Sequence, residues 1–143
     1  MHRFSKDQKR WGMASFDEFN EDGLLDEKEV KLSQLLKTKG QSMIYEYDFG
    51  DDWRHKVLLE DILPAFVEPT CADCQAGSRN CPPEDVGGAP GYAMFLESLK
   101  DPKNDDFEHI MEWLEDGFDP AAFDLKELNK LLKEMQLPLP HLF

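Results

Sequence analysis

Carboxylate and imidazole side chains gather in two short segments of the chain, around residues 48–55 and around residues 82–92. Such groups, if they converge, can hold a divalent metal ion or transfer protons. The structural alternative is that the aspartates form turns and the histidine packs on a strand. No nucleophile–base pair can be named, so a binding surface is the leading expectation and a catalytic cluster of Asp51, His55, Glu84 and Asp85 is the rival. The candidate surface comprises Asp48, Asp51, Trp53, His55, Glu84, Asp85 and Tyr92.

Three cysteines lie in one Pro-rich and Gly-rich stretch, with the spacing Cys71-x2-Cys74-x6-Cys81. A Cys-x2-Cys turn commonly supplies two of the four ligands of a zinc ion, and a fourth could come from His55 or Glu84. A second Cys-x2-Cys pair is absent, so a buried thiol pair is the alternative to zinc. An odd number of cysteines without a secretory signal predicts a cytoplasmic protein.

An acidic segment at residues 18–29 resembles a calcium-binding loop. Oxygen-bearing side chains stand at its positions 1, 3, 5 and 9, glycine at position 6 and glutamate at position 12. Position 1 is Glu18, where the pattern expects aspartate, and the entering helix would have to span residues 5–17. The alternatives are therefore calcium and a solvated acidic loop.

The charge of the chain is strongly acidic, with 30 Asp and Glu against 16 Lys and Arg and a net charge of −14. This balance argues against a surface that tracks nucleic-acid phosphates. Four cations nevertheless open the chain: Arg3, Lys6, Lys9 and Arg10. We expect them on a solvated strand edge, where an unpaired edge would invite strand addition by a partner or a second copy. No apolar run approaches the length of a membrane span.

The clearest local structure is a hairpin at residues 43–60, because apolar and polar residues alternate on both sides of the turn Gly50-Asp51-Asp52. A three-residue turn would pair Phe49 with Trp53 and Tyr47 with His55. The same register pairs Asp48 with Arg54 and Glu46 with Lys56 across the other face.

Helical periodicity appears once before this hairpin, at residues 29–37, and three times after it. The later segments begin near Tyr92, Phe107 and Asp124, where Asp124 and Glu127 form a capping-box-like start. Strands first and helices last predict an α+β fold with a mainly antiparallel sheet and three C-terminal helices.

Several linked motifs resemble the plasmid pRiA4b ORF-3-like family over about residues 43–132: the stretch from Tyr45 to His55, Cys81-Pro82-Pro83-Glu84-Asp85-Val86-Gly87-Gly88, Gly91-Tyr92, Trp113 and Phe118-Asp119-Pro120. The resemblance implies an α+β fold and one domain over residues 1–143. Members usually start with a strand and a helix, which are absent here, before a Leu-His-x-Phe strand that resembles Met1-His2-Arg3-Phe4.

The function expected from these observations is a non-enzymatic binding or interaction module. Its partner would be a protein or a second copy, with nucleic acid and membrane disfavoured. The first alternative is a metal-dependent enzyme that uses the Asp/His/Glu cluster. Some family members carry a resolvase label, so a DNA-mobility accessory role is the other alternative.

Overall fold

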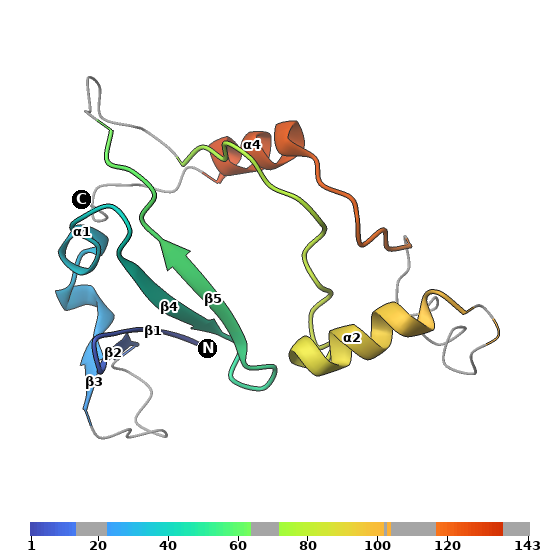
Figure 1. Ribbon diagram of the computed structural model, residues 1–143, viewed down its shortest axis with the longest axis horizontal. Helices are drawn as coiled ribbons and strands as arrows, with labels where there is room; N and C mark the ends of the chain where they lie inside the picture. Colours follow the sequence, from blue (N-terminus) through green and yellow to red (C-terminus); the bar gives the residue numbers. More distant parts are fainter. Residues whose placement is uncertain (14–22, 64–71, 102, 104–116, 136–143) are drawn as a thin grey trace. The chain divides into compact units, whose positions relative to one another are not determined.

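The computed structural model describes residues 1–13, 23–63, 72–101, 103 and 117–135 (Figure 1). Within these ranges, no helix combines the length and the apolar character that a membrane crossing requires. In chain order, the elements are β1 (His2–Lys6), β2 (Lys9–Gly12), β3 (Leu24–Asp26), the 3-10 helix η2 (Glu27–Glu29), α1 (Leu32–Leu35), β4 (Ser42–Tyr47), β5 (Trp53–Leu58), α2 (Gly88–Ser98) and α4 (Leu125–Glu134).

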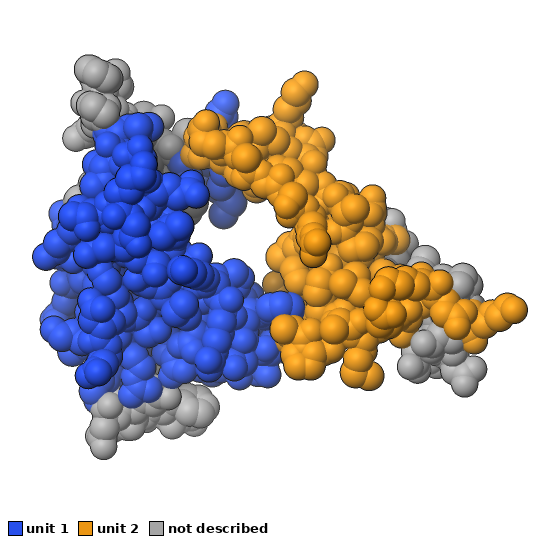
Figure 2. Space-filling model, viewed as in Figure 1, with its two compact units in different colours: residues 1–72, 132–143 blue, residues 73–131 orange. Residues whose placement is uncertain are grey.

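The chain divides into two compact units, residues 1–72 with 132–143 and residues 73–131 (Figure 2). The first unit holds the sheet and α1, and the second holds α2 and the segments that flank it. Each unit is described by itself below. The expected single domain over residues 1–143, without the family's first strand and helix, stays a prediction.

The first unit is built on a five-stranded sheet in the order β3-β2-β1-β4-β5. β1 pairs antiparallel with β2 and with β4, and β4 pairs antiparallel with β5, whereas β3 runs parallel to β2. The sheet is therefore mixed, and the prediction of a mainly antiparallel sheet followed by three C-terminal helices is wrong. The parallel pair was missed because β3 has only three residues, too few to show an alternating pattern.

Helices after the hairpin also differ from the expectation. In the part of the chain that the structure describes, two helices follow it, α2 and α4, and the third helix, α1, precedes it. The helix expected near Phe107 lies outside the described residues. α1 falls within the segment 29–37 that was expected to be helical. Leu35 in this helix and Leu36 directly after it are buried, whereas Leu32 is exposed.

β1 and β2 form a tight hairpin where the sequence suggested a strand or, for a calcium loop, an entering helix at residues 5–17. Lys6 pairs with Lys9, so the loop has two residues, Asp7 and Gln8, whose φ angles are 49° and 66°. Two positive φ angles are typical of the type I′ turn, whose twist matches that of the flanking strands. The hairpin places β1 inside the sheet, beside β4.

One face of the sheet carries the core of the first unit. Trp11 from β2 and Met43 from β4 contact Leu35 and Leu36, so α1 and the residue after it cover this face. Phe4, Val30, Val57 and Leu59 pack around the cluster. Since side chains alternate along a strand, Arg3, Ser5, Glu46, Arg54 and Lys56 lie on the opposite face.

The hairpin of β4 and β5 forms as predicted, but its register is shifted by two residues. Tyr47 pairs with Trp53, Tyr45 with His55 and Glu46 with Arg54. The loop holds five residues instead of three, because the amide of Asp52 donates to the carbonyl of Asp48 at 2.6 Å. An even shift keeps every side chain on its predicted face, so the predicted faces are right and the predicted partners are wrong.

Aromatic packing and short polar links hold the second unit together. The ring of Phe95, which is 5% exposed, lies 5.9 Å from that of Tyr92 and 5.3 Å from that of Phe118. The carboxamide of Asn129 accepts from the amide of Cys74 at 2.7 Å and donates to its carbonyl at 2.9 Å. These contacts join α2 and α4 to the extended segments beside them.

Candidate functional site

The turn between β4 and β5 is fixed by its own aspartates. Asp48 and Asp52 both have positive φ, at 53° and 51°, a conformation that aspartate tolerates better than most residues. The carboxylate of Asp48 accepts from the amide of Gly50 at 3.1 Å, and its amide donates to the carbonyl of Met1 at 2.8 Å. Asp48 therefore shapes the turn and ties it to the start of β1.

His55 belongs to a row of rings across the sheet. Its ring centroid lies 5.7 Å from that of Tyr45, which lies 5.0 Å from that of Phe4 and 5.9 Å from that of His2. His55 is exposed because β5 is the outermost strand. The row therefore ends in an accessible imidazole beside aromatic rings, not among carboxylates.

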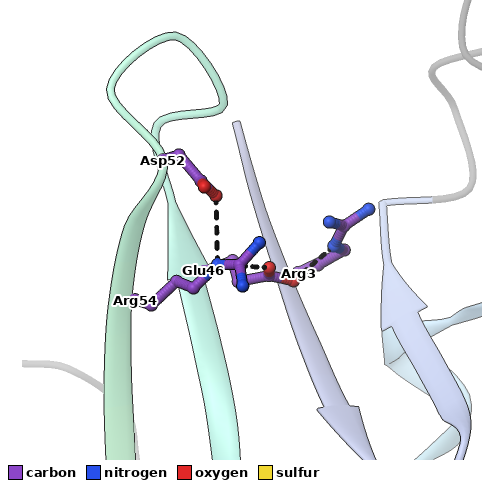
Figure 3. Close-up of polar contacts among 4 residues, drawn as sticks. All are labelled: Arg3, Glu46, Asp52 and Arg54. Carbon is purple, nitrogen blue, oxygen red and sulfur yellow. Dashed lines mark hydrogen bonds and ion pairs between the residues drawn. The ribbon is translucent and has the colours of Figure 1, made fainter. Parts of the chain in front are cut away.

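A charged cluster crosses the opposite face of the sheet at Glu46 (Figure 3). Its carboxylate, 8% exposed, lies 2.5 Å from Nε of Arg3 and 3.4 Å from Nε of Arg54. Arg54 Nε also lies 3.3 Å from the carboxylate of Asp52, and the guanidinium of Arg3 lies 5.2 Å from the centre of the Phe49 ring. The sequence predicted that Asp48 pairs with Arg54 and Glu46 with Lys56. In the shifted register, Glu46 pairs with Arg54.

β5 forms one of the two outer edges of the sheet built by the described strands. Leu59 donates to the carbonyl of Gln41 at 2.9 Å, which makes the odd-numbered residues of β5 the hydrogen-bonded partners of β4. The even-numbered residues Arg54, Lys56 and Leu58 therefore turn their N–H and C=O groups away from β4. No other described strand pairs with that side of β5.

The remaining candidate surface residues belong to the second unit. Glu84 and Asp85 are exposed in the turn before α2, and Asp85 has a φ of 56°. α2 begins at its N-cap Gly87, whose carbonyl accepts from the amide of Gly91 at 3.1 Å. Tyr92 stacks on Phe95, so it is a packing residue of this unit. Whether these residues share a surface with the β4–β5 hairpin stays a prediction.

The two metal sites expected from the sequence are only partly described. Cys71 lies outside the described residues, Cys74 Sγ lies 3.3 Å from the carbonyl of Ala76, and Cys81 is exposed. Of the calcium-like loop, the first positions lie outside the described residues. Its later part forms β3 and η2, where the carboxylate of Asp26 accepts from the amide of Lys28 at 2.9 Å. Among the residues that the structure describes, no three His, Cys, Asp or Glu side chains are grouped to hold a metal ion.

Two of the four cations near the start of the chain, Arg3 and Lys6, make contacts within the first unit. Arg3 pairs with Glu46, and the ammonium of Lys6 donates to the carbonyl of Leu35. Because β1 and β2 lie inside the sheet, the edges formed by described strands are β3 and β5. The expectation that the four cations lie on a solvated strand edge is therefore wrong, because β3 and β4 pair with the outer sides of the β1–β2 hairpin.

Comparison with known proteins gives a consistent family match. The model of the plasmid pRiA4b ORF-3-like protein family matches residues 1–127. The uncharacterised protein y4hQ of Sinorhizobium fredii is 36% identical over 126 residues, 87% of this chain and 64% of its own length. The crystal structure of a protein of unknown function, MM3350 from Methanosarcina mazei Go1, is 38% identical with a TM-score of 0.74. That match covers 89% of this chain and 71% of the MM3350 chain. The chain thus spans a little under two thirds of its relative y4hQ.

Proposed function

The chain belongs to the plasmid pRiA4b ORF-3-like family, and from that premise we propose that it is a protein-interaction module. An extended segment of a partner protein adds to the sheet along the outer edge of β5. The observation that carries the proposal is the line of outward backbone groups at Arg54, Lys56 and Leu58, on the six-residue edge strand of the sheet. Main-chain hydrogen bonds give such strand addition its affinity, and side chains give it its specificity.

The side chains of β5 indicate what kind of segment fits. Arg54 and Lys56 are both exposed on one face, and His55 is exposed on the other. Opposite charges directly across two strands are stabilising, so an acidic segment suits this edge. Lys56 has no ion pair with any described residue, which leaves its ammonium available to a partner carboxylate.

Exposed aromatic rings at the hairpin turn extend the proposed surface. Tyr47 is 38% exposed and Phe49 is 40% exposed, and Trp53 lies opposite Tyr47 on β5. Aromatic side chains are enriched where proteins bind one another, because they bury a large area with few rotatable bonds. The turn therefore supplies apolar anchors at one end of the edge.

The experiment selects peptides from a phage-displayed random library on the full chain and measures their binding to two variants of one residue. Lys56→Pro removes an outward N–H, at an edge position where proline is tolerated. Lys56→Ala keeps that N–H and removes only the charge. We expect acidic peptides that lose binding to the proline variant and keep part of it with the alanine variant. Circular dichroism checks that both variants fold.

Hydrogen exchange of the peptide complex provides the decisive control. Protection of the amides of Arg54, Lys56 and Leu58 supports strand addition. Peptides that bind the proline variant as tightly as the wild type, or protection that appears elsewhere, contradict it. The alternatives of a metal-dependent enzyme and a DNA-mobility accessory protein stay predictions. For the first, the described residues contain no group of three His, Cys, Asp or Glu side chains that could hold a metal ion.

A further inference from the structure

A hollow of about 450 Å³ opens in the first unit between the β1–β2 hairpin, β3, η2 and α1. This volume lies in the range of small-molecule sites, about 300–1,000 Å³. It is far from β5 in the strand order, so it is independent of the proposed interaction edge. None of the sequence motifs pointed to it, because its residues come from five separate elements.

Apolar side chains form one part of the hollow. Trp11 and Leu35 are each 8% exposed, and Val30 and Leu25 lie beside them. An indole and three branched aliphatic side chains favour a ligand with a compact apolar body, above all a planar ring.

Two lysines border the hollow from the β1–β2 hairpin. Lys6 and Lys9 are direct cross-strand partners, and like charges in that position repel each other. The ammonium of Lys6 donates to the carbonyl of Leu35, so its place is fixed, and its side chain is only 13% exposed. An anionic group of a ligand would relieve this repulsion and accept hydrogen bonds from both ammonium groups.

Three carboxylates also border the hollow. That of Asp7, in the turn of the β1–β2 hairpin, lies 4.0 Å from the ammonium of Lys6, and the other two come from β3 and η2. Asp26 is held by the amide of Lys28, and Glu29 lies at the end of η2 with no ion pair to any described residue. Their negative charges, next to the indole of Trp11, suit an ammonium group of a ligand.

We propose that this hollow binds a small zwitterion with an apolar body, the chemistry of a free aromatic amino acid. The carboxylate of the ligand binds Lys6 and Lys9, its ammonium binds Glu29 and Asp26, and its ring packs on Trp11 and Leu25. A ligand with only one of the two charges would make charged hydrogen bonds on one side of the hollow alone, so we expect it to bind more weakly.

Calorimetric titration of the full chain with L-phenylalanine tests the proposal. We expect saturable binding. Binding of 3-phenylpropionate, which lacks the ammonium, and of 2-phenylethylamine, which lacks the carboxylate, is expected to be roughly tenfold weaker, since each loses one charged contact. Lys9→Gln and Glu29→Gln should each weaken L-phenylalanine binding by a similar factor.

Matched controls use charged residues that do not border the hollow. Lys28→Gln and Glu60→Gln should leave the affinity unchanged. Absence of binding by L-phenylalanine, or equal binding of the three compounds, overturns the proposal. Equal effects of the border and control substitutions overturn it too, because only net charge would then matter.

Discussion

Glu46 is a buried carboxylate that two guanidinium groups share (Figure 3). Its removal takes this ion pair from Arg3, whereas Arg54 keeps the carboxylate of Asp52 at 3.3 Å. Breaking a buried ion pair from one side costs about 3–5 kcal/mol. The side chain of Arg54 is 63% exposed, so water can solvate its guanidinium when Glu46 is removed. We therefore expect Glu46→Ala to lower the free energy of unfolding by about 3 kcal/mol, the low end of that range. Urea denaturation measures this loss.

The control for this prediction is Glu97→Ala, which also breaks an ion pair, with Lys100 at 2.7 Å, but on an exposed helix surface. Its expected cost is at most about 0.5 kcal/mol, because exposed pairs are screened by water. A loss at Glu46 as small as the loss at Glu97 would show that the cluster is not a structural centre of the sheet.

Asp124 caps α4, where its carboxylate accepts from the amides of Lys126 at 2.9 Å and Glu127 at 3.0 Å. The hydrogen bond from Glu127, followed by that from Lys126, holds the pKa of Asp124 below its ordinary value. A lowered pKa in the folded state means that the cap stabilises the helix above the unfolded-state pKa and loses this effect as the pH falls through the folded-state pKa. Acidification below about pH 4 should therefore loosen the start of α4.

The chemical shifts of the amides of Lys126 and Glu127 measure this effect. We expect Asp124→Asn to keep the cap and remove the acid transition, and Asp124→Ala to lose the cap at every pH. Glu134→Gln, at the other end of α4, is the control and should leave the transition unchanged. An acid transition that persists in Asp124→Asn would assign it to another carboxylate.

The register of the β4–β5 hairpin is the main prediction at the scale of an element. Ile44 and Lys56 are a non-hydrogen-bonded pair, whose Cα atoms lie about 4.5 Å apart in an antiparallel sheet. In a background where the three native cysteines are serine, Ile44→Cys with Lys56→Cys should form a disulfide bond readily. Ile44→Cys with Leu58→Cys, which suits the predicted register with a three-residue turn, is the control and should remain largely reduced. Mass spectrometry after thiol labelling measures which pair is oxidised. If the control pair forms the disulfide and the test pair does not, the register with a three-residue turn is correct.

The sequence could predict this hairpin and its two faces, because alternation alone decides which side chains share a face. It could not predict the partners, since Asp48 and Asp52 both take positive φ and lengthen the turn from three residues to five. A shift of two residues leaves the alternating pattern unchanged, so the pattern cannot reveal it. The same shift explains why Arg54, which was expected opposite Asp48, lies opposite Glu46.

The strand or turn on which a candidate residue lies could be predicted where local pattern was enough, and not where the tertiary fold decided. That these residues form one site stays a prediction. The aspartates at the turn and the exposed His55 lie where alternation placed them. The ring of Tyr92, in contrast, packs against that of Phe118, which is 26 positions away. No local sequence pattern links the two residues. The hollow beside Trp11 depends on β3, whose three residues carry too little periodicity to be recognised.

At the scale of the whole molecule, the net charge of −14 should make stability depend on salt. Like charges repel within the folded chain, and salt screens that repulsion. We expect the thermal midpoint at neutral pH to rise by a few degrees between low salt and about 0.5 M NaCl. At a pH near the sequence pI of about 4.5, the same salt should have little effect. A midpoint that falls with salt at neutral pH would show that ion pairs such as that of Glu46 outweigh the net repulsion.

The two cations of β5 also have a consequence for contacts between copies of this chain. Only Arg54, Lys56 and Leu58 turn backbone groups outward, so two β5 strands could bond only with these residues facing each other. The two most central antiparallel registers set Arg54 opposite Lys56, or Lys56 opposite its own copy, and like charges across strands are destabilising. Open edges of this length invite runaway stacking into fibres. We therefore expect the charges of β5 to disfavour pairing between two copies of this edge, whereas the acidic segment proposed above would meet them with opposite charge.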